Sequence, residues 1–125
     1  MRAAILVLLV QCSVNAHHSF AAEYDTAKPV RLDGVIARFD FINPHAEIYL
    51  DVHGSRWWIE GASPQALSQR GITKSSVRSG MRVIIQGFQA RDGSRRVKGC
   101  AIILPGGMKL LLDPSGASFP DAGVE

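Results

Sequence analysis

The sequence is poor in cysteine. Only Cys12 and Cys100 occur among its 125 residues, and Cys12 lies in the apolar N-terminal stretch. If that stretch is removed as a leader, Cys100 has no partner, so an intramolecular disulfide is excluded. Cys100 falls within an apolar strand pattern, where we expect a small buried side chain rather than a reactive thiol.

The sequence also lacks a strong charge of either sign. Its formal net charge is +3, and it falls to +2 without Arg2, because 13 basic residues then face 11 acidic ones. A nucleic-acid partner is not expected at so low a positive charge. Hydrophobic residues make up 46% of the chain and charged residues 20%, which indicates a folded domain rather than a disordered chain.

Motifs of the known catalytic classes are absent. Ser19, Ser55 and Ser63 lie in no nucleophile motif, and there is no His-Glu-x-x-His pattern. Glu47 and Asp51 could pair as acid and base, but alternating carboxylates on an outward strand face usually serve solvation. We therefore do not expect an enzyme.

No apolar run is long enough to cross a membrane as a helix. The run Ala3–Val10 follows Arg2 and precedes the small residue Ala16, which is the order of parts in a secretory signal peptide. We expect cleavage after Ala16, and a periplasmic or secreted mature protein with no transmembrane segment. A lipoprotein anchored through Cys12 is a less favoured alternative, because the bulky Gln11 precedes that cysteine.

Apolar residues that alternate with polar ones predict a mainly β domain. The expected strands are Pro29–Phe41, Glu47–His53, Arg56–Glu60, Met81–Phe88, Arg95–Leu104 and Met108–Leu112. Ser63 as N-cap, Pro64 at the first helical position and Gly71 as the stop signal predict one short helix between the third and fourth strands.

The first expected strand changes its alternation. The apolar residues Val30 and Leu32 have even numbers, whereas Val35, Ala37, Phe39 and Phe41 have odd numbers, and Gly34 lies where the pattern changes. A β-bulge at Gly34 would keep both sets on one face. The residues expected to face the interior are Val35, Ala37, Phe39, Ile48, Leu50, Val52, Val83 and Ile85.

Three strands, a short helix and two more strands are the element order of an OB-type fold. We predict a small OB-like antiparallel barrel of five to six strands with one short helix, and an open sheet or half of a β-sandwich remains the alternative. The expected organisation is a signal peptide over 1–16, an N-terminal arm over 17–28, the barrel over 29–112 and a flexible tail over 113–125.

Histidines gather near the expected new terminus. Cleavage after Ala16 makes His17 the first residue, and its free amine and ring could bind copper(II) together with a second imidazole. His45, at the start of the second strand, is the candidate for that imidazole, and His18 is an alternative ligand. The competing interpretation is that His17 and His18 form a solvated terminus and that His45 caps the preceding turn.

A candidate partner surface involves aromatic and basic residues. Trp57 and Trp58 are adjacent in one strand and must point to opposite faces, so one of them is expected to be partly exposed. Arg91, Arg95 and Arg96 surround the turn before the fifth strand. Together these residues could bind an unidentified periplasmic protein or a small ligand, although the arginines could equally be a solvated hairpin end.

Several motifs carry a family resemblance. They are His17-His18-Ser19-Phe20, Asn43-Pro44-His45-Ala46, Glu60-Gly61-Ala62-Ser63-Pro64, Gly87-Phe88 and Ala90-Arg91-Asp92-Gly93-Ser94. In these motifs the chain resembles DUF6152, an uncharacterised family of small exported bacterial proteins. The resemblance implies export but no activity, substrate or cofactor. One departure is Arg56-Trp57-Trp58, where the preceding loop is shorter than the family pattern leads us to expect.

The sequence thus favours an exported, non-catalytic binding module for a partner protein or small ligand. Copper binding through the mature N-terminal histidine is the alternative function. A purely structural component of the cell envelope cannot be separated from the first interpretation by sequence.

Overall fold

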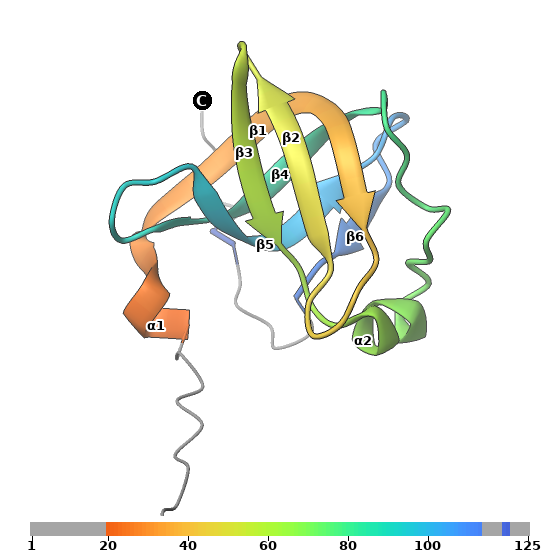
Figure 1. Cartoon of the computed structure of the whole chain (residues 1–125), viewed down its shortest axis with the longest axis horizontal. Helices are drawn as coiled ribbons and strands as arrows, with labels where there is room; N and C mark the ends of the chain where they lie inside the picture. Colours follow the sequence, from red (N-terminus) through yellow and green to blue (C-terminus); the bar gives the residue numbers. More distant parts are fainter. Residues whose placement is uncertain (1–19, 114–118, 121–125) are drawn as a thin grey trace, which may run out of the picture.

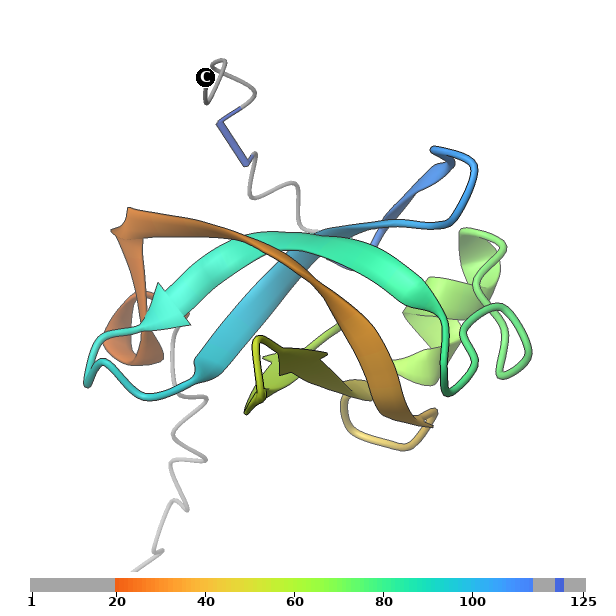
Figure 2. The ribbon, with the colours of Figure 1, turned by 90° about the horizontal axis from the view of Figure 1, so that it is seen from above.

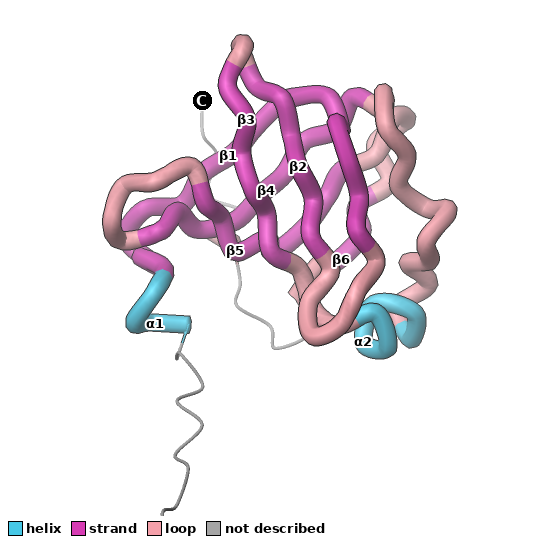
Figure 3. Tube along the Cα trace, viewed as in Figure 1, coloured by secondary structure: helices cyan, strands magenta, loops and turns pink. Residues whose placement is uncertain are grey.

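Six strands and two short helices make up the part of the chain described by the computed structural model, residues 20–113 and 119–120. They are α1 (Phe20–Glu23), β1 (Tyr24–Asp40), β2 (Glu47–Val52), β3 (Ser55–Glu60), α2 (Pro64–Gln69), β4 (Arg82–Ala90), β5 (Arg96–Ile103) and β6 (Lys109–Leu111). The expected signal peptide, with His17 and His18, lies outside the described residues. α1 leads into β1, and α2 lies beside the loop that joins β1 to β2 (Figures 1 and 3).

The strands form one sheet in the order β3-β2-β1-β4-β5-β6, and β3 also pairs with β5. That extra pairing is parallel and joins Trp58–Glu60 to Arg96–Lys98, whereas all the other strand pairs are antiparallel. It closes a ring of five strands around the interior (Figure 2), and β6 is added along the second half of β5. The predicted mainly β fold of five to six strands with a short helix is confirmed in this form.

Aliphatic side chains fill the interior of the ring. The largest fully buried ones include Ile36, Ile48, Leu50, Ile59, Ile85 and Ile102 from the strands and Leu67 from α2. Ser63 caps α2 as predicted, because its Oγ accepts a hydrogen bond from the Ala66 N–H at 3.2 Å. The predicted stop is confirmed as well, since Gly71 follows the helix with φ +83°.

The predicted bulge at Gly34 is wrong. Gly34 pairs with Val83 in regular register with β4. The register shift against β2 falls between Ile36 and Arg38 instead, so the extra residue of the bulge is Ala37.

The set of inward-facing residues changes accordingly. Ile36, which the alternation argument passed over, is 1% exposed and continues the parity of Leu32. Val35 is 37% exposed and Ala37 is only partly buried, so the prediction that both face inward is wrong. Phe39, beyond the bulge, packs against the core. The remaining predictions are confirmed: Ile48, Leu50, Val83 and Ile85 are buried, and Val52 packs against the core.

Gly34 is needed for close approach between strands rather than for a bulge. A Cβ atom at this position would lie 2.5 Å from the backbone oxygen of Asp51 and 2.9 Å from side-chain atoms of Leu50 and Val52. Real Cβ atoms do not come so close to other atoms, so β1 crosses β2 where only glycine fits.

β1 begins at Tyr24, earlier than the expected Pro29. Residues 26–29 are exposed, and the register with β4 shifts between Tyr24 and Pro29, so this stretch shows no apolar alternation. Tyr24 itself is 2% exposed and forms a second small cluster with Phe88, Ala90 and Cys100. The expectation of a buried Cys100 is confirmed.

Replacing Gly34 by alanine should lower the free energy of unfolding by about 1–3 kcal/mol, the usual range for overpacking, because the new methyl group would meet the Asp51 carbonyl. The matched control is Gly61→Ala, whose methyl group would have its nearest neighbour at 3.6 Å, and which should change stability by less than about 1 kcal/mol. Urea denaturation measures the change in the free energy of unfolding for each of the two variants. Equal effects of the two substitutions would contradict the close-approach argument.

Candidate functional site

A row of arginine and aromatic side chains crosses the outer surface of the ring. The strand registers place Arg38 beside Tyr49, Tyr49 beside Trp58, and Trp58 beside Arg96. The Arg38 Cζ lies 5.8 Å from the centre of the Tyr49 ring, and the Arg96 Cζ lies 5.2 Å from that of Trp58. Arg96 also lies 5.9 Å from the ring centre of Tyr24. We call Arg38, Tyr49, Trp58 and Arg96 the Arg–aromatic row.

Trp57 and Trp58 point to opposite sides of the sheet, as the alternation predicts. Trp57 pairs with the fully buried Leu50 and packs against the core. Trp58 pairs with Tyr49 and belongs to the outer surface. Of the two tryptophans, only Trp58 therefore contributes to the Arg–aromatic row.

A row of charged side chains runs beside the Arg–aromatic row. Its members, in register on successive strands, are Asp40, Glu47, Glu60 and Lys98. Asp40 accepts a hydrogen bond from the Arg38 Nε at 2.6 Å, and Glu47 accepts one from the Tyr49 hydroxyl at 3.1 Å. These carboxylates therefore fix the positions of two members of the Arg–aromatic row.

Glu60 connects three separate segments of the chain. Its Oε2 accepts a hydrogen bond from the Tyr24 hydroxyl at 2.9 Å. Its Oε1 lies 3.5 Å from the His45 Nε2 and 3.8 Å from the Lys98 Nζ. The side chains of Glu60 and Lys98 are 16% and 15% exposed, so solvent screens this pair less than it screens the more exposed pairs Arg56–Asp51 and Arg82–Asp33.

The surroundings of Tyr24 favour its protonated form. Burial and the adjacent negative charge of Glu60 raise the pKa of the Tyr24 hydroxyl to about 12. Burial likewise raises the pKa of the Cys100 thiol to about 11, so this cysteine is poorly suited to nucleophilic chemistry at neutral pH.

The structure describes only part of the predicted metal set. His45 lies in the loop before β2 with its side chain 47% exposed, and its nearest charged partner is Glu60. Among residues 20–113 and 119–120, no three His, Cys, Asp or Glu side chains gather in a way that could hold a metal ion. Since His17 and His18 lie outside those residues, the copper set stays a prediction.

The three arginines of the predicted partner surface differ in their surroundings. Arg96 belongs to the Arg–aromatic row, and its terminal nitrogen lies 3.9 Å from the Glu23 carboxylate. Arg91 lies 4.0 Å from the carboxylate of Asp25 at the start of β1. Arg95 is exposed, and its backbone oxygen accepts a hydrogen bond from the Trp58 N–H at 2.9 Å.

Sequence reasoning missed Arg38, Tyr24 and Tyr49 as members of the site. Tyr49 lies between Ile48 and Leu50, which were predicted to face the interior, so the alternation of this strand was a usable signal for its outward position. The positions of Arg38 and Tyr24 could not be found in this way, because the bulge at Ala37 and the register shift after Tyr24 interrupt the alternation of β1.

The raised pKa of Tyr24 predicts a loss of stability at alkaline pH. The unfolded chain binds the phenolic proton with a pKa near 10 and the folded chain with a pKa of about 12, so this stabilisation is complete below pH 10 and is lost as the pH rises through 12. Tyr24→Phe should lower the free energy of unfolding at neutral pH by about 1.5–3 kcal/mol, the value of a hydrogen bond to a charged group.

Urea denaturation at several pH values measures this effect as the difference between the wild-type protein and Tyr24→Phe. The difference should shrink between pH 10 and 12. Cys100 loses its proton over a lower range, near pH 9 to 11. Because this happens in both proteins, the contribution of Cys100 cancels when their free energies of unfolding are subtracted. Tyr49→Phe is the control on the outer face. A folded protein in which Tyr24 ionises at its ordinary pKa, followed by tyrosinate absorbance, would contradict the prediction.

No helix among the described residues is long and apolar enough to span a membrane.

Comparison with known proteins places the chain in a family. No curated protein and no solved structure matches the sequence. A family model described as "Family of unknown function (DUF6152)" matches residues 5–99, which is more than half of the chain. The protein therefore belongs to the DUF6152 family.

Proposed function

We propose that this protein is an exported, non-catalytic module that binds a partner protein through the Arg–aromatic row. The observation that supports the proposal is the side-by-side arrangement of Arg38, Tyr49, Trp58 and Arg96 on one outer face. Tryptophan, tyrosine and arginine are the residue types that contribute most of the binding energy at protein interfaces. A row that crosses four strands offers these groups on a rigid support.

The surroundings of the row also suit an interface. On one side lie the charged residues Asp40, Glu47, Glu60 and Lys98. On the other side the Arg56 Nε lies 2.8 Å from the Asp51 carboxylate. An aromatic centre with a polar rim of both signs is the usual composition of a non-obligate interface. A small ligand is the less favoured occupant, because small-molecule sites are concave and enclose most of their ligand.

The proposed location is the periplasm or the cell exterior. The order of the first 16 residues, Arg2, an apolar run and then Ala16, supports export followed by cleavage. The proposal of a non-catalytic role rests on the sequence, in which the serines lie in no nucleophile motif and no His-Glu-x-x-His pattern occurs.

Photo-crosslinking in the native cells tests the partner-binding proposal. A photoreactive phenylalanine analogue at Tyr49 should give one discrete heavier product on illumination, because Tyr49 lies at the middle of the Arg–aromatic row. The matched control places the analogue at Gln65, an exposed residue of α2. A second substitution, Trp58→Ala, should reduce the yield of the product by about tenfold, as expected for loss of an interface anchor.

Mass spectrometry identifies the crosslinked product, and urea denaturation shows whether each variant folds. The same products at Tyr49 and Gln65, or no product at Tyr49 in a folded and exported protein, would overturn the proposal. A yield that Trp58→Ala does not change would also overturn it.

Copper(II) binding is a second candidate function, favoured by the position of His45. Its Nε2 faces the Glu60 carboxylate, an arrangement that commonly orients a ligating imidazole and leaves Nδ1 for the metal. Tyr24 bonds to the same carboxylate. His17 precedes the first residue of α1, Phe20, by three positions, so a stretch of this length reaches at most about 11 Å from Phe20. The proposed ligands are the amine and ring of His17 and the ring of His45, with His18 as an alternative.

Copper titration of four samples tests this candidate: the exported protein, His45→Ala, a peptide of residues 17–22, and a protein with one residue added before His17. The exported protein should bind most tightly, because the fold positions the second imidazole. The added residue should abolish binding through the terminal amine. Affinity should weaken as the pH falls below the amine pKa near 8. Equal affinity of all four samples, or an intact mass that shows a terminus other than His17, would overturn it.

A further inference from the structure

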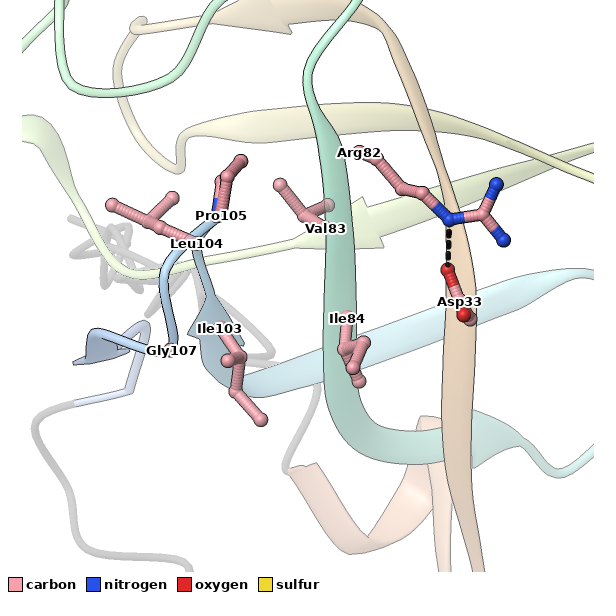
Figure 4. A pocket seen from close by; sticks show the side chains of 8 residues that line it. All are labelled: Asp33, Arg82, Val83, Ile84, Ile103, Leu104, Pro105 and Gly107. Atoms are coloured by element: carbon pink, nitrogen blue, oxygen red, sulfur yellow. Dashed lines mark ion pairs between the residues drawn. The ribbon is translucent and has the colours of Figure 1, made fainter.

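A second candidate site lies where β4 and β5 part from each other. Ile84 and Ile103 form the last pair between the two strands at this end. Next to this pair is an open pocket of about 340 Å³. Ile84 and Ile103 line it side by side, and Leu104 and Pro105 continue the wall (Figure 4). This volume lies within the range typical of small-molecule sites.

One rim of the pocket is charged. The Arg82 Nε lies 3.0 Å from the Asp33 Oδ1, and both side chains are more than half exposed. A guanidinium group carries five N–H donors, of which this contact uses one. Figure 4 shows the contact on a single guanidinium nitrogen, with the two terminal nitrogens apart from Asp33. Those terminal nitrogens can bind a second anion.

The charges near this rim are mainly positive. Arg31 is on β1, two residues before Asp33, and is exposed. Arg82 and Arg31 therefore place two guanidinium groups near Asp33, the one carboxylate among the residues that line the pocket. Such an excess favours an anionic ligand over a cationic one.

Exposed apolar side chains lie close to the pocket. Val35 pairs with Arg82 in the sheet and is 37% exposed. Met108 follows Gly107, which lines the pocket, and is 64% exposed. An apolar surface that continues beyond the pocket walls marks a site for a ligand with an apolar part.

We infer that this pocket binds a small amphipathic carboxylate. The apolar part of the ligand lies against Ile84, Ile103 and Leu104, and its carboxylate binds the terminal nitrogens of Arg82, in the paired geometry that arginine offers to carboxylates. Asp33 positions the guanidinium but also repels the ligand. This site is independent of the Arg–aromatic row, which uses β1, β2, β3 and the start of β5.

Decanoate is the probe, with decanol and decyltrimethylammonium as the neutral and cationic ligands of equal chain length. Amide NMR titration of the full exported protein should show decanoate shifting the signals of Ile84, Ile103 and Gly107. Decanol should bind more weakly, and the cation should give no specific shifts, because Arg82 and Arg31 repel it.

Three substitutions separate the charge effect from the apolar one. Arg82→Gln should weaken decanoate binding by about tenfold, as loss of a charge-assisted pair predicts, and leave decanol binding unchanged. Asp33→Asn should strengthen decanoate binding, because it removes the competing carboxylate. Arg78→Gln, an exposed arginine outside the pocket, is the control and should change neither. All three variants should fold, because exposed ion pairs add little to stability.

Several outcomes would overturn the inference. They are an absence of shifts with decanoate up to about 1 mM, equal affinity for decanoate and the cation, and equal effects of Arg82→Gln and Arg78→Gln. Line broadening that grows with protein concentration and does not respond to decanoate would show that a second copy of the chain covers this face instead.

Discussion

The parallel contact between β3 and β5 is the constraint on which the rest of the structure depends. It joins only Trp58–Glu60 to Arg96–Lys98, and the Trp58 N–H donates to the Arg95 oxygen just before it. Without this contact the six strands would form an open sheet with two free edges. With it, the side chains of Ile59 and Val97, both 0% exposed, face the interior from the two sides of the closure.

The same contact builds the outer surface. Trp58 and Arg96 come together only because β3 lies beside β5, and so do Glu60 and Lys98. Each outer row therefore contains one member from a strand that is distant in the sequence. Neighbouring residues of a strand point to opposite faces, so these four side chains point outward because Ile59 and Val97 point inward. The register between β3 and β5 therefore determines both the core at this place and the candidate interface.

Much of the fold followed from the sequence, because alternation and turn chemistry are local signals. The strand pattern of Ile48 and Leu50 and the cap of α2 at Ser63 were read in this way. The bulge was misplaced because Gly34 offered a more obvious switch than Ala37 did. Only the neighbouring strands decide between them, since the register with β2 shifts between Ile36 and Arg38 and the register with β4 is regular at Gly34. Register between strands is not a local property, and the Arg–aromatic row depends wholly on it.

The arginines on the two proposed surfaces are held in different ways, and this difference sets what each surface can bind. Arg38 bonds to Asp40 and lies over Tyr49, whereas Arg96 lies between the rings of Tyr24 and Trp58. Side chains fixed in this way lose little entropy when a broad surface covers them, which favours a protein partner. Arg82 has Asp33 as its ion-pair partner and no aromatic contact of this kind among the described residues. Its side chain is 72% exposed, so an anion that binds there must displace water, and burial of apolar surface in the adjacent pocket would add to the affinity of the proposed ligand.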